Sequence, residues 1–92
     1  MKEEFSRTEK VIGSDAVTKL NAAKVAVFGV GGVGGHAAEA LVRAGIGRID
    51  LIDFDTVSVS NINRQIVALH STVGKKKVDV LKVRFLDINS SL

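Results

Sequence analysis

The stretch of sequence that decides the fold reads Val25-Ala26-Val27-Phe28-Gly29-Val30-Gly31-Gly32-Val33-Gly34. Its apolar half predicts a strand, and its glycine-rich half predicts a tight turn that opens a helix. The first N–H groups of such a helix have no partners within it and lie at its positive dipole end, so they attract a phosphate. The spacing of Gly29, Gly31 and Gly34 fits the dinucleotide fingerprint G-x-G-x-x-G, in which a side chain would block the approach of the ligand.

An acidic residue ends the second apolar run of the chain, Arg48-Ile49-Asp50-Leu51-Ile52-Asp53. Asp53 follows Gly34 by 19 residues, close to the distance at which a carboxylate binds the ribose of a nucleotide. The strand, the turn, the helix and the acid together predict an adenine-nucleotide site. The alternative is a glycine turn that only lets the helix pack closely on the strand.

Helical and strand periodicities divide the chain into five predicted elements. They are a helix over 14–21 capped by Ser14, a strand over 24–28, a helix over 33–44, a strand over 48–53 and a helix over 75–89. The strand over 24–28 is apolar and is therefore expected to be covered on both faces. The apolar faces of the last two helices are expected to contain Val33, Ala37, Ala40, Leu41 and Ala44 in the first, and Val78, Leu81, Phe85 and Ile88 in the second.

A strand, a helix and a strand with short connections predict a right-handed crossover between parallel strands. The chain is therefore α/β, and we expect a Rossmann-like βαβα arrangement that forms the N-terminal portion of a doubly wound parallel sheet. Residues 1–92 would be the N-terminal part of a single nucleotide-binding domain. Two parallel strands leave open sheet edges and a third strand is expected only after Leu92, so we interpret the sequence as truncated.

The composition is that of a globular domain, with 46% hydrophobic and 25% charged residues. The absence of cysteine excludes disulfides, thiolate metal sites and a cysteine nucleophile within this sequence, and His36 and His70 have no partners at a metal-binding spacing. Nothing resembles a signal peptide or a membrane span, so a cytoplasmic protein without membrane contact is expected. The net charge of +3 and the run Lys75-Lys76-Lys77 leave open whether Lys75 and Lys76 are merely solvated or contact phosphates.

The segment 53–69 is polar and follows the second strand, at the sheet edge where open α/β proteins bind ligands. It contains Asn61, Asn63 and Arg64, and both amide and guanidinium groups can donate to phosphate oxygens. A triphosphate site needs such groups, whereas a site for hydride transfer has no special need for them. The alternative is that the two asparagines cap turns and that Arg64 pairs with Asp55.

Four motifs together carry a resemblance to a known family. They are Gly-x-Gly-Gly-x-Gly at 29–34, Asp53-x-Asp55, Ser60-Asn61-Ile62-Asn63-Arg64-Gln65 and Val73-Gly74-x-x-Lys77. In order and spacing they resemble the ThiF/MoeB/HesA family of E1-like adenylyltransferases, over nearly the whole chain but over only the front third of such a domain. The form Asn63-Arg64-Gln65-Ile66-x-Ala68-Leu69 is closer to the tRNA threonylcarbamoyladenosine dehydratase branch, the TcdA/CsdL type, than to the sulfur-carrier activators.

The resemblance implies an ATP-dependent ligase-type enzyme, in which a substrate carboxylate attacks the α-phosphate of ATP and pyrophosphate leaves. In the dehydratase branch the carboxylate belongs to a threonylcarbamoyl group on a tRNA adenosine, which then cyclises with loss of AMP. The resemblance also implies a homodimer, Mg²⁺ held by an aspartate downstream of this sequence, and a set of nucleotide-binding residues. These are Gly29, Gly31, Gly32, Gly34, Asp53, Asp55, Ser60, Asn61, Arg64, Lys77 and, from a neighbouring subunit, Arg7. Arg64 and Lys77 are the expected catalytic residues, because their charges would offset the charge that grows on the leaving pyrophosphate.

Three other functions stay open on the sequence alone. An activator of a sulfur-carrier or ubiquitin-like protein would share the adenylation step but take a protein partner. An NAD-dependent oxidoreductase would share the glycine turn and Asp53 but would leave Asn61, Arg64 and Lys77 without a role. A non-catalytic nucleotide-binding or dimerisation module would need none of the phosphate chemistry, and Arg7 could then be a solvated surface residue.

Overall fold

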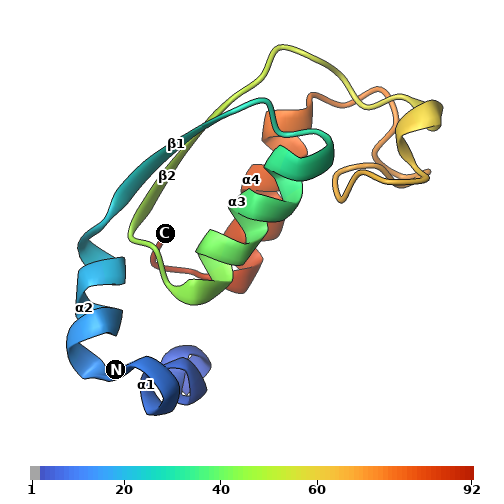
Figure 1. The fold of residues 1–92 in the computed structure, drawn as a ribbon. Coiled ribbons are helices and arrows are strands. Elements are labelled where there is room, and N and C mark those ends of the chain that lie inside the picture. The colour runs from blue at the N-terminus through green and yellow to red at the C-terminus, as the bar shows by residue number, and fades with distance from the viewer. Residues whose placement is uncertain (1–2) are drawn as a thin grey trace.

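The computed structural model describes residues 3–92 and contains every helix and strand that the sequence predicts (Figure 1). Its elements are the 3-10 helix η1 (Glu3–Phe5), α1 (Ser6–Ile12), α2 (Ser14–Ala22), β1 (Lys24–Phe28), α3 (Gly32–Ala44), β2 (Arg48–Ile52), the 3-10 helix η2 (Val59–Asn61) and α4 (Lys77–Ile88). The sequence analysis missed η1, α1 and η2, which are too short for a helical period to stand out. Within residues 3–92 no helix is both long and apolar enough to cross a membrane.

The two strands form a parallel sheet, with α3 as the crossover between them. Their register pairs Lys24 with Arg48 at one end and Phe28 with Ile52 at the other. The N–H of Gly29 then donates to the Ile52 carbonyl oxygen at 2.9 Å, which extends the pairing into the glycine turn. The predicted α/β fold with a βαβα order and a parallel sheet is therefore confirmed.

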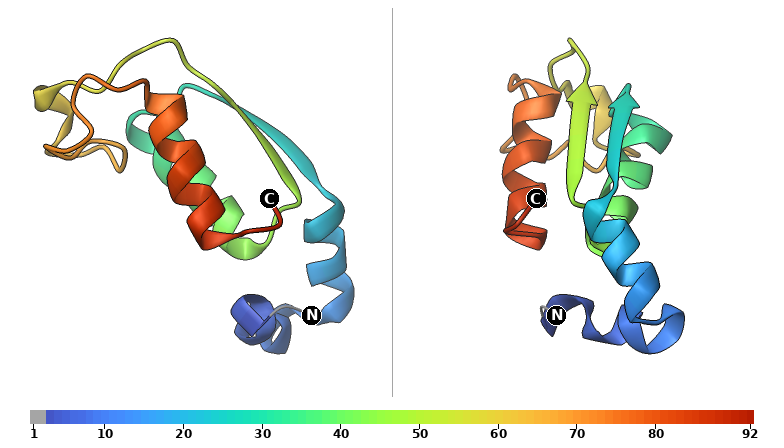
Figure 2. Two further views of the ribbon diagram at one scale, coloured as in Figure 1. Left: turned by 180° about the vertical axis from the view of Figure 1, so that it is seen from behind. Right: turned by 90° about the vertical axis from the view of Figure 1, so that its left-hand side faces the viewer.

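Helices α3 and α4 lie on the same face of the sheet, as the views in Figures 1 and 2 agree. The core fills the space between these helices and the strands, and its buried members are Val30, Ala38, Val42, Ile46, Val57, Val67, Ala68, Leu81 and Phe85. The apolar stripe predicted for the last helix is confirmed, because Leu81 and Phe85 are fully buried and Val78 and Ile88 pack against the core. The two helices are also joined by an ion pair between Glu39 on α3 and Arg84 on α4.

The opposite face of the sheet is open, so the prediction that β1 is covered on both faces is wrong for residues 3–92 (Figure 2, right). Exposed and half-buried residues alternate along β1, and the Phe28 side chain is 78% exposed. The reason is topological: both helices that follow a strand pack on one side. The apolar composition of β1 predicts burial but cannot say which element supplies it.

The buried face of α3 agrees with the prediction only in part: Leu41 packs against the core as expected, but other positions differ. Val33 is 86% exposed and Ala37 and Ala40 are exposed, whereas Gly35, Ala38 and Val42 are buried. Gly35 explains the choice, because a Cβ at this position would lie 2.5 Å from the Val30 carbonyl oxygen. The helix approaches the strand along its glycine side, and this close approach buries Ala38 and turns Ala37 and Ala40 outward.

An N-terminal arm of η1, α1 and α2 leads into the amino end of β1 (Figure 1). Gly13 joins α1 to α2 and has φ of +89°. Gly13 is also the N-cap of α2 and no side-chain cap bond is formed, so the predicted capping role of Ser14 is wrong. Ser14 is already the first helical residue, because the chain enters α2 directly from the preceding helix.

Candidate nucleotide-binding site

The glycine turn joins the carboxyl end of β1 to the first turn of α3. Gly32 has φ of +45°, and nothing lies within 4 Å of the position that its Cβ would take. A Cβ on Gly34 would instead overlap the Gly29 carbonyl oxygen. Gly32 thus leaves open surface beside the N–H groups of the helix, whereas Gly34 is needed for the packing of α3 against its own turn.

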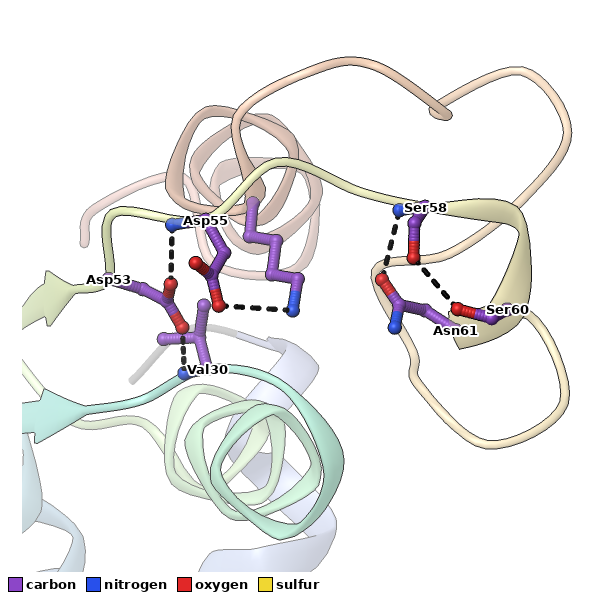
Figure 3. Close-up of polar contacts among 7 residues, drawn as sticks. Val30, Asp53, Asp55, Ser58, Ser60 and Asn61 are labelled. Atoms are coloured by element: carbon purple, nitrogen blue, oxygen red, sulfur yellow. Dashed lines mark hydrogen bonds and ion pairs between the residues drawn. The ribbon is translucent and has the colours of Figure 1, made fainter.

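Asp53 directly follows β2 and connects the two chain segments at this end of the sheet. Its Oδ1 accepts the N–H of Asp55 at 2.8 Å, and its Oδ2 accepts the N–H of Val30 at 3.0 Å (Figure 3). These two hydrogen bonds, and then the positive charge of Lys77, hold the pKa of the Asp53 carboxyl below its usual value against the opposing effect of burial. Asp53 is therefore a permanent carboxylate at neutral pH, and it lies next to the glycine turn.

Lys77 is a buried cation at the start of α4. Its Nζ lies 4.0 Å from Oδ2 of Asp55, and its side chain is 8% exposed compared with 78% for that aspartate. Its backbone N–H also donates to the Asp55 carbonyl oxygen at 3.1 Å. An antiparallel bridge between Thr56 and Lys76 continues this pairing, so the backbone itself brings the start of α4 to the end of β2.

The loop between β2 and α4 is organised by its own polar side chains. The Ser58 N–H donates to Oδ1 of Asn61 at 2.9 Å, and the hydroxyl oxygens of Ser58 and Ser60 are 3.0 Å apart (Figure 3). Asn61 is buried and does cap a turn, as the structural alternative held. Because its oxygen accepts this bond, the amide Nδ2 is the part of the side chain suited to donate to a ligand.

Arg64 lies on the exposed side of the same loop and does not pair with Asp55. Its Nη1 donates to the Ser60 carbonyl oxygen at 3.0 Å and to Oδ1 of Asn63 at 2.9 Å, both of them neutral acceptors. The Nε2 of His36, on the exposed face of α3, lies 3.2 Å from the Arg64 carbonyl oxygen, so this side chain ties the loop to the helix that follows the glycine turn.

Gln65 is a residue of the site that the sequence analysis left out. Its side-chain amide covers Gly31, since a Cβ there would lie 2.9 Å from both Nε2 and Oε1 of Gln65. Within residues 3–92 the Oε1 atom is buried and has no hydrogen-bond partner. In the sequence, the available signal was its place in the polar motif beside Arg64. In the structure, a buried polar atom next to a phosphate-type turn is expected to meet a ligand or a water molecule.

The structure brings some of the expected site residues together and separates others. Asp53, Asp55 and Lys77 gather beside the glycine turn, and Ser60 and Asn61 form a second group farther along the loop (Figure 3). Arg7 lies on α1, at the opposite end of the molecule from the glycine turn (Figure 1). Its role at a nucleotide therefore stays a prediction that requires a second subunit.

Three known proteins and one family model resemble this chain closely. The model of the ThiF family matches residues 5–92. The tRNA threonylcarbamoyladenosine dehydratase of Bacillus subtilis is 55% identical over 89 residues, which are 97% of this chain and 35% of that protein. A crystal structure of the Escherichia coli enzyme TcdA in complex with ATP superposes with a TM-score of 0.95 and 46% identity, over 97% of this chain and 37% of that one.

A molybdopterin-synthase adenylyltransferase of Haemophilus influenzae is 39% identical over 80 residues, 87% of this chain and 33% of that protein. The chain thus spans about a third of the length of these bacterial dehydratases and of this adenylyltransferase. The family model covers all but four residues of the chain, and in the structure the glycine turn, Asp53 and Lys77 meet at the carboxyl end of the sheet. We conclude that the chain belongs to the ThiF family.

Proposed function

We propose that the protein activates a carboxylate by ATP-dependent adenylation, and that the carboxylate is the threonylcarbamoyl group of a modified adenosine in tRNA. The observation that carries the proposal is the match to the ATP-bound E. coli dehydratase, with a TM-score of 0.95 over 97% of this chain. The 55% identity to the B. subtilis dehydratase supports the same substrate. The reaction would be the cyclising dehydration of that nucleoside.

In this proposal the ATP lies across the glycine turn. The open surface at Gly32 admits the phosphates beside the N–H groups of the α3 N-terminus, where the helix dipole favours negative charge. Asp53 accepts hydrogen bonds from the ribose hydroxyls, because each carboxylate oxygen keeps a second lone pair after bonding to the backbone. Gln65 supplies an amide group beside the turn, with its Oε1 atom buried.

The chemical step forms a bond from the substrate carboxylate oxygen to the α-phosphorus and breaks the bond to the pyrophosphate oxygen. Lys77 and Arg64 offset the negative charge that grows on the leaving pyrophosphate. Lys77 is suited to this because burial strengthens its field, and Arg64 because its guanidinium donates to two neutral acceptors and so keeps its net charge. The carbamoyl part of the same threonylcarbamoyl group then attacks the adenylated carboxyl carbon and loses a proton, which closes a ring as the bond to AMP breaks and AMP leaves.

The remaining parts of the proposal concern the assembly. Mg²⁺ would accompany the triphosphate, but within residues 3–92 no three His, Cys, Asp or Glu side chains lie together, so we assign the ion no ligands here. A homodimer would allow Arg7 of one subunit to reach the ATP of the other, which the distant position of α1 makes necessary. We place the protein in the cytoplasm together with its tRNA substrate.

A second candidate is the activation of a sulfur-carrier protein. The 39% identity to the H. influenzae molybdopterin-synthase adenylyltransferase favours it as the alternative. Both functions share the adenylation of a carboxylate, and they differ in whether that carboxylate belongs to an RNA nucleoside or to a protein C-terminus. The nucleotide site alone does not separate them, so the substrate must be tested directly.

The test uses the full-length protein in two steps. Calorimetry first compares ATP with Mg²⁺ against NADH, and tighter binding of NADH would contradict an adenylating enzyme. The protein is then incubated with ATP and tRNA that carries threonylcarbamoyladenosine, and the nucleoside is analysed by mass spectrometry. The expected product has lost one water molecule and forms together with equimolar AMP and pyrophosphate. ATP–pyrophosphate exchange that needs a carrier protein rather than tRNA would favour the alternative.

A further inference from the structure

The positive charge of this protein is concentrated in one segment. Residues 56–78 contain four of the thirteen lysine and arginine residues and none of the ten carboxylates. The rest of the chain has nine cations against ten carboxylates, so the net charge of +3 comes entirely from this segment. Most of the segment lies in the loop between β2 and α4, which projects at the carboxyl end of the strands, and its last two residues begin α4 (Figure 1).

The base of this loop is held by backbone hydrogen bonds. The Val57 N–H donates to the Lys75 carbonyl oxygen at 2.8 Å, and Lys76 forms the antiparallel bridge to Thr56. Both lysines are exposed, although their backbone is fixed. They are therefore anchored next to Lys77, at the rim of the candidate nucleotide site.

The four cations of the segment are not equivalent. Lys77 is buried and faces Asp55, so its charge acts inside the site. Arg64, Lys75 and Lys76 are exposed, and the nearest carboxylate along the chain after them is Asp79, in the first turn of α4. Because Arg64 is assigned to the leaving pyrophosphate, Lys75 and Lys76 are the exposed cations of the segment that stay outside the site, where a phosphate backbone can reach them.

We propose that Lys75 and Lys76 bind the phosphate backbone of the RNA that carries the reacting carboxylate. The inference rests on the proposed function, because a carboxylate on a nucleoside can reach the α-phosphate of ATP only if the RNA passes the rim of this site. An RNA strand fits better than an acidic protein, since it offers evenly spaced charges to a segment without a single carboxylate. The two lysines position the substrate and take no part in the chemical step.

The test measures tRNA binding by the full-length protein as a function of salt. The Lys75→Gln/Lys76→Gln double variant loses two phosphate contacts. The negative slope of the logarithm of the association constant against log salt should therefore become shallower by about 1.4–1.8. The ratio of the two dissociation constants should then change about tenfold between 50 and 200 mM salt. A Lys19→Gln/Lys24→Gln variant is the matched control, because it removes the same charge at the amino end of β1 from residues that are also exposed.

The inference is overturned if the Lys75/Lys76 variant keeps the wild-type slope, or if the control variant lowers the slope equally. It is also overturned if the Lys75/Lys76 variant loses affinity for poly-glutamate but not for tRNA, which would indicate an acidic protein partner. ATP binding by calorimetry and ATP–pyrophosphate exchange are measured on the same samples. Their absence in the wild type would remove the proposed function, whereas intact exchange with an unchanged salt slope would remove only this inference.

Discussion

Replacement of Asp53 by Asn tests the double role of this side chain as a structural connection and as a ribose ligand. The carboxylate accepts one backbone N–H on each oxygen, at 2.8 and 3.0 Å. An amide keeps one acceptor and turns an NH₂ group toward the other donor, so one bond is lost and the second is no longer charge-assisted. Hydrogen bonds to charged groups contribute about 1.5–3 kcal/mol each, and partial exposure reduces this, so we expect Asp53→Asn to lower the free energy of unfolding by about 2 kcal/mol.

The pH dependence of this loss has a defined sign. Because the pKa of Asp53 is lower in the folded protein than in the unfolded chain, its stabilisation is present above the unfolded value and is lost as pH falls through the folded one. The stability difference between wild type and Asp53→Asn should therefore be constant near neutral pH. It should shrink as the solution is acidified below the ordinary pKa of an aspartate, about 3.9.

Urea unfolding of the full-length proteins between neutral and acidic pH measures this difference, and calorimetry measures ATP affinity at pH 7. Asp50→Asn is the matched control on the strand that Asp53 follows, because within residues 3–92 its carboxylate pairs only with Arg48, at 3.3 Å, and both side chains are more than half exposed. We expect the control to change stability by less than about 1 kcal/mol. An Asp53→Asn variant as stable as the control would refute the structural role, and unchanged ATP affinity would refute the ribose contact.

Three further predictions follow from the same contacts. Arg64→Ala should reduce the rate of adenylation by about 10²–10³-fold with a much smaller change in ATP affinity, as single-turnover pyrophosphate release measures, because its charge acts on the leaving group. Glu39→Gln should lower the free energy of unfolding by about 1 kcal/mol, as measured by chemical denaturation at pH 7. Because the Arg84 hydrogen bond holds the pKa of Glu39 below its usual value, this loss should vanish in acid. His36→Leu should slow adenylation a few-fold at saturating ATP whereas His36→Gln should restore the rate, because only the amide can donate to the Arg64 carbonyl oxygen; equal rates for both variants would exclude this positioning role.

A polypeptide of these 92 residues alone should self-associate. A cavity of about 450 Å³ runs along the outer edge of β2, and its lining combines apolar side chains such as Leu51, Val78 and Phe85 with charged ones such as Asp50 and Lys82. The other face of the sheet exposes Phe28, and two parallel strands are fewer than independent stability usually requires. Sedimentation equilibrium at micromolar concentration tests this, and a cooperatively folded monomer would contradict it.

Local patterns predicted the order of the major elements well, because the relevant signals lie within short windows. The strand before the glycine turn and the stripe with Leu81 and Phe85 on α4 are examples. The face of α3 was predicted only in part, for Leu41 but not for Val33, Ala37 or Ala40, because the small residues of this helix are compatible with two stripes. Only the close approach of Gly35 to the Val30 carbonyl oxygen decides between them, and this is a tertiary contact.

The candidate site shows the same division between local and long-range information. The sequence placed Asp53 at the end of a strand, but its bond to the Val30 N–H joins residues 23 positions apart and has no local signature. Gln65 was overlooked for the same reason, since its importance depends on the loop folding back over Gly31. One alternative from the sequence was that Asp55 pairs with Arg64. In the structure Asp55 pairs with Lys77 instead, because the backbone bridge brings the start of α4 to that aspartate.

The backbone bridge between Thr56 and Lys76 also makes the outer part of the loop structurally independent of Asp55 and Lys77. It closes the intervening loop at its base, and Val67 and Ala68 fasten the middle of the loop to the core. The stretch 69–73 contains none of the residues that we assign to the nucleotide, so it can be exchanged or lengthened without moving Asp55, Arg64 or Lys77. Doubling the length of a flexible loop costs only about 0.6 kcal/mol of closure entropy. Loop grafting between relatives that act on different carboxylates can thus transfer substrate preference while the nucleotide end of the sheet stays unchanged.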